Sequence, residues 1–240
     1  MTSAKDIIVK PIKSTVANSF VRKNHYSKKI AATSSLNFGI FFNNILVGAA
    51  QFGRPIDKYL HINIVKNTGW NEFLELNRLV ILDVTPKNTE SRAISIMMKL
   101  IKKHYPNIKW IISFADACQC GDGTIYRASG FKLLKINNSS GLYKLPDGST
   151  IHRLSLSGGN YSSRRKEMLM AGYTNPTAYI EKVLRGKKLK GYQLKYIYFI
   201  DKSKEKDLTI PILPFSRIEE MGAKMYKGKR VSTVKTQSNA

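Results

Sequence analysis

The chain contains few cysteines and no long apolar run. Its two cysteines, Cys118 and Cys120, are too few and too close together to form a disulfide framework, so we expect a reducing compartment. No apolar stretch reaches the roughly 18 to 20 residues that are needed to span a bilayer. The N-terminus also lacks the hydrophobic region of a secretory signal. These absences predict a soluble, cytoplasmic protein.

Zinc-binding patterns are also missing. Cys118 and Cys120 are accompanied neither by a second closely spaced cysteine pair nor by a histidine at zinc spacing. His61, His104 and His152 are metal-binding candidates by residue type alone. The sequence therefore argues against an ordinary zinc site.

Acidic residues are scarce, whereas basic residues are abundant. The chain has 40 lysines and arginines against 16 aspartates and glutamates, which gives a formal net charge of +24. Residues 1–150 hold 21 basic and 9 acidic side chains and residues 151–240 hold 19 and 7, so each part carries +12. Because the charge is not confined to a tail, we expect one continuous cationic face that binds a polyanion. The alternative is a solvated surface that is rich in lysine.

The middle of the chain predicts a β-α-β unit. Residues 79–82 and 110–115 are near-continuous apolar runs, as in strands that are covered on both faces. Between them, apolar side chains fall at helical spacing at Ile94, Met97, Met98 and Ile101. Such units form right-handed crossovers, and ligands collect beyond the carboxyl ends of their strands. We therefore expect the functional site in residues 85–92 and 116–126.

The remaining patterns complete an α/β (α+β) fold with a central mixed sheet flanked by helices. We expect strands at 7–11 and 192–200, a hairpin of 38–42 and 46–52 around Asn43 and Asn44, and strands at 131–136 and 142–145 that close the sheet. Predicted helices cover 14–24 with Ser14 as cap, 163–171, and 176–185 with Asn175 as cap. The predicted domains are a catalytic core at 1–150, a basic extension packed on it at 151–220, and a flexible basic tail at 221–240.

Two segments resemble the acyl-CoA-binding GNAT N-acetyltransferase superfamily. They are residues 88–93 (NTESRA), where a helix begins, and residues 125–131 (IYRASGF). In that superfamily a loop of the form Q/R-x-x-G-x-G/A holds the pyrophosphate, and a tyrosine of the second segment lies near the thioester sulfur. Asn88 and Ser91 replace the initial Gln or Arg and the first Gly of that loop. The resemblance implies a GNAT-like fold and acetyl-CoA or another small acyl donor.

A narrower resemblance covers most of the chain. Residues 24–28 (NHYSK), 75–79 (ELNRL), 113–116 (SFAD) and 123–126 (GTIY) occur in the order used by the phage Mu Mom family of DNA adenine-modification proteins. The segment from 192 to 218 also resembles that family. The resemblance implies a transferase that adds an acetamido-type group to N6 of adenine in phage or mobile-element DNA and protects it from restriction, in the cytoplasm of a host cell. It also implies an iron ion.

The candidate catalytic residues come from these motifs. Asp116 directly follows an apolar strand, where a partly desolvated carboxylate suits a base or a metal ligand; the alternative is that it caps the following turn. Asp122, in the same loop, is predicted to cap the helix that follows it. Tyr126 could donate a proton to a leaving group or orient the donor, or it could simply pack in the core. His25 and Tyr26 end the first helix. His25 could ligate iron together with Asp116 or shuttle a proton, and Tyr26 could stack on adenine; a structural role is the alternative for both.

The candidate donor-binding residues are Arg78, Asn88, Ser91 and Arg92. Arg78 lies in an otherwise apolar strand and needs an anion, which could be Glu75 or a substrate phosphate. Ser91 and Arg92 begin a helix whose free amides and dipole favour an anion. Capping of this helix by Thr89 or Ser91 is the alternative.

The candidate partners are double-stranded DNA, a small-molecule donor and a second copy of the chain. Basic side chains after residue 160 are predicted to bind DNA phosphates, namely Arg164, Arg165, Lys166, Lys187, Lys188 and Lys190. An adenine amine lies within the base stack, so the base must be flipped out or the strand opened. The hairpin and the terminal strand could each pair in a homodimer. An ordinary N-acetyltransferase acting on an RNA or protein amine, and a non-catalytic DNA-binding protein, are the alternative functions.

Overall fold

The computed structural model describes residues 3–55, 57–118, 120–138, 141–156, 163–226 and 229–231. Contacts divide the chain into two compact units, one of residues 1–136 with 194–240 and one of residues 137–193. The predicted core ended at residue 150 and the predicted extension began at 151; these domain assignments stay predictions. Within the described part, no helix is long and apolar enough to cross a membrane.

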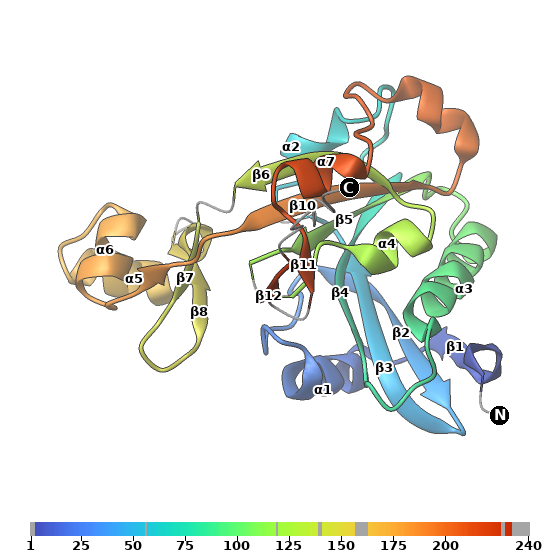
Figure 1. The fold of residues 1–240 in the computed structure, drawn as a ribbon, viewed down its shortest axis with the longest axis horizontal. Coiled ribbons are helices and arrows are strands. Elements are labelled where there is room, and N and C mark those ends of the chain that lie inside the picture. Colours follow the sequence, from blue (N-terminus) through green and yellow to red (C-terminus); the bar gives the residue numbers. More distant parts are fainter. Residues whose placement is uncertain are drawn as a thin grey trace, which may run out of the picture. The chain divides into compact units, whose positions relative to one another are not determined.

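The first unit is built on a seven-stranded mixed sheet (Figure 1). This finding confirms the predicted α/β class with a central mixed sheet flanked by helices. In spatial order the strands are β1 (Ile8–Pro11), β2 (Ser34–Phe42), β3 (Ile45–Gly53), β4 (Phe73–Ile81), β5 (Trp110–Asp116), β10 (Tyr192–Phe199) and β6 (Lys132–Asn138). The helices of this unit are α1 (Ser14–Asn24), α2 (Tyr59–Ile62), α3 (Thr89–His104), α4 (Thr124–Ala128) and α7 (Ser216–Glu220).

The N-terminal part of this sheet follows local sequence signals closely. Asn43 and Asn44 have φ angles of 50° and 61°, a left-handed conformation that Asn tolerates, and they join β2 to β3 as the predicted hairpin. Helix α1 has the predicted bounds, but the predicted Ser14 cap is wrong. Lys13 occupies the capping position and its side chain makes no capping hydrogen bond. A basic side chain offers no acceptor, so the first turn of α1 lacks the usual cap.

A buried polar network fixes α1 on the sheet. Helix α1 packs on β2, β3 and β4. Gln51 of β3 is fully buried, and its amide Nε2 donates to Asn18 Oδ1 at 2.8 Å and to Asn37 Oδ1 at 3.2 Å. Because buried amides without partners are costly, these bonds specify one position of α1. The C-terminal end of α1, which carries His25 and Tyr26, is thereby held beside β4.

Strands β4 and β5 form the predicted β-α-β unit. They pair in parallel from Phe73 with Trp110 to Leu76 with Ser113, and α3, which connects them, buries Ile94, Met97, Met98 and Ile101. Beyond this pairing β4 continues to Ile81 and β5 continues to Asp116. In the described residues no further β4–β5 pairs follow. The carboxyl ends of the two strands therefore separate and leave room for side chains between them.

Two strand placements differ from expectation. Strand β10 follows β6 in sequence but lies between β5 and β6 in the sheet. The strand predicted at 142–145 does not close this sheet: β7 (Leu142–Lys144) pairs with β8 (Thr150–His152) and β9 (Lys187–Lys188) in a separate three-stranded sheet. A short apolar run indicates a strand but not its partner. Strands β2, β3 and β10 are all internal, so the strands that suggested a homodimer are not sheet edges.

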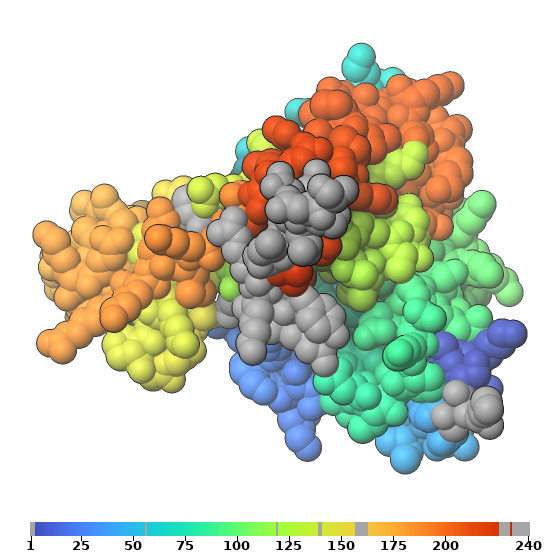
Figure 2. All heavy atoms as spheres, in the orientation of Figure 1, coloured from blue at the N-terminus to red at the C-terminus, as the bar shows by residue number. Residues whose placement is uncertain are grey.

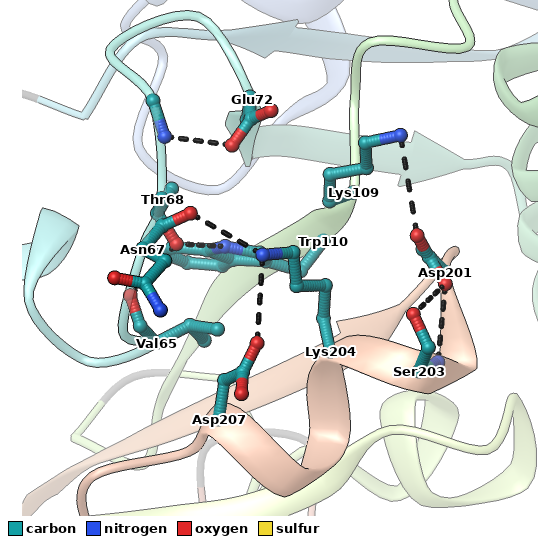
Figure 3. Close-up of polar contacts among 11 residues, drawn as sticks. Val65, Asn67, Thr68, Glu72, Lys109, Trp110, Asp201, Ser203, Lys204 and Asp207 are labelled. Atoms are coloured by element: carbon teal, nitrogen blue, oxygen red, sulfur yellow. Dashed lines mark hydrogen bonds and ion pairs between the residues drawn. The ribbon is translucent and has the colours of Figure 1, made fainter.

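The amino end of β5 is held by the loop at 65–72 and by the 3-10 helix η3 (Lys202–Asp207), as Figure 3 shows. Trp110 stacks on Phe73 with ring centroids 4.1 Å apart, and its Nε1 donates to Thr68 Oγ1 at 3.2 Å. Lys204 donates to the carbonyl oxygen of Asn67 at 3.2 Å and pairs with Asp207 at 3.4 Å. These contacts hold the amino end of β5 in place, whereas no described residue of its carboxyl end is paired with β4.

The second unit has its own small core. Besides its sheet it contains η2 (Arg153–Leu156), α5 (Ser163–Met170) and α6 (Pro176–Lys182). Tyr143, Ile151, Leu156, Met168, Tyr179 and Ile180 pack together. Asn175 Oδ1 accepts the backbone N–H groups of Thr177 and Ala178, which confirms the predicted cap of α6.

The C-terminal segment lies only partly within the described residues. The predicted flexible tail, residues 221–240, includes 227–228 and 232–240, which fall outside them. In the described remainder, β11 (Met225–Tyr226) pairs with β12 (Lys229–Arg230). The short 3-10 helix η1 (Ala4–Asp6) begins the described chain and is capped by Ser3.

Candidate active site

Asp116 and Tyr26 meet at the open end of β5. The Tyr26 hydroxyl donates to Asp116 Oδ2 at 3.5 Å, although the two residues lie ninety positions apart. Asp116 Oδ1 accepts the backbone N–H of Cys118 at 2.9 Å, so the carboxylate also holds the turn that follows the strand. Tyr26 is 46% exposed. The turn-capping role considered from the sequence is thus present, and the same carboxylate also accepts a hydrogen bond from a tyrosine whose ring is partly exposed.

The His25 ring packs against the Tyr26 ring. The imidazole is 6% exposed, and its ring centroid lies 4.3 Å from that of Tyr26. His25 Nδ1 accepts the backbone N–H of Ser27 at 3.2 Å, so the proton of the neutral ring is on Nε2. The structural role that the sequence left open for His25 is therefore present, because the imidazole positions the Tyr26 ring.

Burial, together with the charges of Arg78 and Lys28, lowers the pKa of His25 to about 4. A histidine that is neutral when folded but protonated when unfolded destabilises the fold as the pH falls. We therefore expect the free energy of unfolding to decrease from pH 6.5 towards pH 4, by about 1.4 kcal/mol for each unit of pKa difference. Urea unfolding at pH 7, 6, 5 and 4 measures this decrease.

The matched variants for this pH prediction are His25→Asn and His104→Asn. In His25→Asn the amide side chain retains an acceptor for the Ser27 N–H but does not titrate, so the stability of this variant should fall less between pH 6.5 and 4. His61, whose pKa burial and Lys195 also lower to about 4, accounts for a remaining decrease. His104 is exposed, and its replacement should leave the wild-type slope unchanged. Equal slopes for His25→Asn and wild type would contradict a neutral buried His25.

Tyr126 lies inside the site. It is 8% exposed and packs with its ring centroid 5.3 Å from those of both Phe131 and Tyr196, so the core-packing role is present. Its hydroxyl hydrogen-bonds with Ser113 of β5. Burial, with the charges of Cys120 and Glu75, raises the pKa of Tyr126 to about 12. The phenol therefore keeps its proton at neutral pH and can donate it, but it cannot act as a phenolate base there.

The phenols and Asp116 are electrostatic neighbours. Burial of its hydroxyl end raises the pKa of Tyr26, and the charges of Asp116, Cys120 and Tyr126 raise it further, whereas Arg78 opposes them. Burial and Asp116 also raise the pKa of the Cys120 thiol. The structure thus brings together Asp116, Tyr26, His25 and Tyr126, which the sequence had proposed as one group. Their catalytic roles stay predictions.

Gly123 and Asp122 position Tyr126. Gly123 precedes α4 with φ at 85°, and a Cβ atom there would lie 2.5 Å from the Tyr196 ring, so only glycine fits. Asp122 is buried and accepts hydrogen bonds from Arg127 at 3.1 Å and from the Thr124 hydroxyl at 3.0 Å. The predicted capping of α4 by Asp122 is wrong, because no side chain caps this helix. Asp122 instead ties the two ends of α4 together.

Arg78 is satisfied by backbone carbonyl groups. Its Nε donates to the carbonyl oxygen of Lys29 at 2.9 Å, and its Nη1 to that of Asn77 at 2.6 Å. In the described ranges no ion pair joins Arg78 to Glu75, the structural partner considered from the sequence. Burial raises the pKa of Glu75, and Asn77 hydrogen-bonds with its carboxyl group. Arg78 therefore contributes positive charge to the site while it fastens residue 29 to β4.

Sequence reasoning did not single out Asn77 and Ser113. Both lie in strands whose apolar pattern shows their faces but not which residues meet across the opening between β4 and β5. Asn77 Oδ1 is buried and has no hydrogen-bond partner among the described residues. An unused acceptor at this position is available to a ligand, because an unpaired buried polar atom is costly.

The N-terminus of α3 carries the candidate donor-binding residues. Asn88 is the N-cap residue with φ at 68°, and its side chain makes no capping bond. The hydroxyl groups of Thr89 and Ser91 donate to the carbonyl oxygens of Pro86 and Asn88, so they do not cap the helix as the alternative required. Asn88 and Arg92 are exposed, and α4 lies beside α3 on one face of this unit (Figure 2). The first amides of α3 are left without side-chain caps, as an anion-binding helix end requires.

The candidate DNA-binding residues all lie in the second unit. Arg164, Arg165 and Lys166 belong to α5, Lys187 and Lys188 form β9, and Lys190 follows it. All are exposed except Arg165, which is half-buried. Their contact with DNA stays a prediction.

A metal site is not formed by the described residues. Within them, no group of three or more His, Cys, Asp or Glu side chains could hold a metal ion. The Nδ1 atom of His25 is already occupied by the Ser27 amide. The ligand set that iron requires is therefore not met here, and the assignment of His25 and Asp116 to iron stays a prediction.

A family model and a curated relative identify the family of this chain. The model of the Mom protein family matches residues 6–217. The methylcarbamoylase Mom of Escherichia phage Mu is 31% identical over 207 residues, which cover 86% of this chain and 80% of that protein. Similar solved structures include spermidine/spermine N-acetyltransferase SpeG from Vibrio cholerae, with 7% identity, coverage of 85% and 98% of the two chains, and a TM-score of 0.45. Another is the ribosomal-protein-S18-alanine N-acetyltransferase from Escherichia coli, with 10% identity, coverage of 81% and 94%, and a TM-score of 0.43.

Proposed function

The chain belongs to the Mom protein family of DNA-modifying transferases, and we propose that it transfers a small group, of the acetamido, acyl or methylcarbamoyl type, to N6 of adenine in DNA. The phage Mu relative is named for methylcarbamoyl transfer, and adenine N6 is the acceptor that the family resemblance implies. We further propose that the modification protects phage or mobile-element DNA from restriction in the host cytoplasm.

One observation carries the proposal. The Tyr26–Asp116 hydrogen bond joins two family motifs, NHYSK and SFAD, at the separated carboxyl ends of β4 and β5. Tyr126, from a third motif, is the electrostatic neighbour of Tyr26. Transfer to the adenine amine needs a general base, a surface that holds the adenine ring and a proton donor. A carboxylate, a partly exposed tyrosine ring and a protonated phenol lie together at this strand end and can fill these three roles.

The proposed reaction balances with these groups. The adenine N6 atom attacks the electrophilic carbon of the donor, so an N6–C bond forms while the bond from that carbon to the leaving group breaks. Asp116 takes the proton that N6 loses. Tyr126, which keeps its proton at neutral pH, donates to the leaving group. Tyr26 donates a hydrogen bond to Asp116 and offers an exposed ring on which a flipped-out adenine can stack.

The donor would supply the electrophilic carbon. We propose that Asn88, Ser91 and Arg92 hold its anionic part at the uncapped start of α3, and that Arg78 adds positive charge. The family resemblance implies acetyl-CoA or another small acyl donor. No step of the proposed mechanism passes through iron, because the described residues do not assemble its ligands.

Mass spectrometry of nucleosides tests the function. DNA from cells that co-express the chain should contain a deoxyadenosine whose added mass corresponds to the transferred group, and DNA from cells without the chain should not. Unmodified nucleosides together with turnover of acetyl-CoA on a protein or RNA amine would support an ordinary N-acetyltransferase. Unmodified nucleosides together with DNA binding would support a non-catalytic protein.

Tyr126→Phe should lower the yield of modified deoxyadenosine by about 10²-fold, because phenylalanine keeps the ring contacts but cannot donate a proton. Tyr173→Phe is the matched control, since Tyr173 belongs to the second unit and packs against Tyr179. The nucleoside assay on both variants, beside thermal melting, measures the effect. Full modification by Tyr126→Phe would show that Tyr126 acts only in packing.

A further inference from the structure

A pocket lies near the amino ends of the two central strands, away from the candidate active site. It has a volume of about 450 Å³, and its lining includes Phe73 and Leu74, which begin β4, and Ile108, which shortly precedes β5. Asp116 stands at the carboxyl end of β5. At about 3.3 Å per residue, the length of β5 separates the two places by roughly 20 Å. The pocket is therefore distinct from the candidate active site.

Lys58 is a cation in the wall of this pocket, and most of its side chain is covered by neighbouring residues. The side chain is only 6% exposed, and its ammonium group lies 4.4 Å from the centroid of Trp70 and 5.2 Å from that of Phe73. Arg54 lines the same pocket and is exposed. Among the described residues, neither Lys58 nor Arg54 forms an ion pair with a carboxylate. Both cations are therefore available to bind an anionic group of a ligand.

Two carboxylates near this pocket, Glu72 and Asp57, accept hydrogen bonds from backbone N–H groups. Glu72 accepts the backbone N–H of Gly69 at 2.6 Å, as Figure 3 shows, and Asp57 accepts that of Leu60 at 3.2 Å. Burial and the neighbouring Arg54 lower the pKa of Lys58. Two cations therefore face the pocket together, and their mutual repulsion favours a bound anion.

Aromatic rings form the outer wall. Trp70 is 39% exposed, and its centroid lies 5.0 Å from that of Tyr59, which is 75% exposed. Tyr105 also lines the pocket and is exposed. Exposed tryptophan and tyrosine rings are platforms on which unpaired bases stack, whatever the base. Asn71 and Ser35 add amide and hydroxyl groups to the rim.

We propose that this pocket binds a nucleotide of an unpaired DNA strand, with its phosphate on Lys58 and Arg54 and its base on Trp70. The two cations, which form no ion pair among the described residues, match the phosphate of a nucleotide. The exposed rings match its base. The choice of DNA as the polymer rests on the proposed function. At the duplex spacing of about 3.4 Å per nucleotide, the roughly 20 Å to Asp116 corresponds to about six nucleotides, and an unpaired, more extended strand needs fewer. The pocket would thus hold the strand at a distance from the modified base.

Tryptophan fluorescence tests the proposal. The chain has two tryptophans, and Trp110 is fully buried, so a stacking base should quench Trp70 alone. Titration of the full chain with a 15-residue single-stranded oligonucleotide at low salt should quench the emission. Trp70→Phe should remove the quenching, and Lys58→Gln should weaken the affinity about tenfold. The affinity of each variant is measured by anisotropy of a labelled oligonucleotide.

Lys66→Gln is the matched control, because Lys66 is exposed and lies outside the pocket lining. It should change the affinity less than about twofold. Lys58→Arg keeps the charge and should retain binding, which separates loss of charge from loss of folding. The proposal is overturned if Lys58→Gln binds as tightly as Lys66→Gln, or if Trp70→Phe is quenched like the wild type.

The source of the nucleotide is decided by two further titrations, with deoxyadenosine monophosphate and with inorganic phosphate. Binding of the mononucleotide as tightly as the oligonucleotide would overturn the assignment to a strand. These measurements do not depend on transfer chemistry. Quenching without modified nucleosides in co-expressed DNA would contradict the proposed transferase activity but support nucleotide binding in the pocket. Modified nucleosides without quenching would support the transferase activity and contradict nucleotide binding in the pocket.

Discussion

Asp116→Asn is expected to lower the yield of modified deoxyadenosine by on the order of 10³-fold in co-expressed DNA, within the range that general bases contribute. An asparagine can still accept the Cys118 amide, which Asp116 Oδ1 accepts at 2.9 Å, so the turn after β5 should persist. It cannot take a proton from the adenine amine. Nucleoside mass spectrometry measures the loss.

Two variants separate chemistry from structure in this experiment. Asp116→Ala removes both the base and the turn acceptor, so it should lower the melting temperature more than Asp116→Asn while abolishing modification equally. Asp83→Asn is the control for a lost carboxylate, because Asp83 is exposed beyond the end of β4. Modification at the wild-type level by Asp116→Asn would mean that Asp116 only holds the turn, and the proposed mechanism would lose its base.

The affinity for duplex DNA is expected to fall about 10³-fold between 50 mM and 200 mM salt. Six basic residues of the second unit, Arg164, Arg165, Lys166, Lys187, Lys188 and Lys190, are the predicted phosphate contacts. Each neutralised phosphate contributes about −0.9 to the slope of log affinity against log salt concentration. Six contacts predict a slope of about −5. Fluorescence anisotropy of a labelled duplex at several salt concentrations measures it.

A triple variant locates this electrostatic contact. Replacing Lys187, Lys188 and Lys190 by glutamine should reduce the slope by about 3, because three phosphate contacts are lost. The control replaces Lys5, Lys99 and Lys103, which are equally basic and exposed but lie in the first unit. A slope unaffected by the first triple variant, or reduced equally by both, would place the DNA contact outside the predicted residues. A flat salt dependence in the wild type would remove the electrostatic part of the proposal.

Local signals predicted individual elements well. The Asn43–Asn44 turn, the helix around Met97 and Met98, and the cap at Asn175 depend on side chains within a few positions of one another. The predicted caps at Ser14 and Asp122 failed. Both residue types favour capping. Helix α1 begins at Ser14 itself, so Lys13 occupies the capping position, and the Asp122 side chain instead accepts a hydrogen bond from Arg127.

Local sequence patterns did not predict which strands pair with each other. A period of two residues tells which face of a strand is buried, but any apolar strand can fit any vacant edge of the sheet. The insertion of β10 between β5 and β6, and the separate sheet of β7, follow from packing of the whole chain. The acceptors of Arg78 likewise could not be predicted, because they are backbone carbonyl groups of residues 29 and 77.

The sequence by itself determined the class of fold, the positive charge, the motifs that identify the family, and the residue types available for chemistry at residues 24–28 and 113–126. Only the tertiary structure decided that Tyr26 donates to Asp116 and that the buried His25 packs against Tyr26. It also decided that Lys58 lies over Trp70 and, among the residues that the structure describes, forms no ion pair. These contacts join segments whose order along the chain says nothing of their distance, because closing a long loop costs little more than closing a short one and the packing of the sheet selects which loops close.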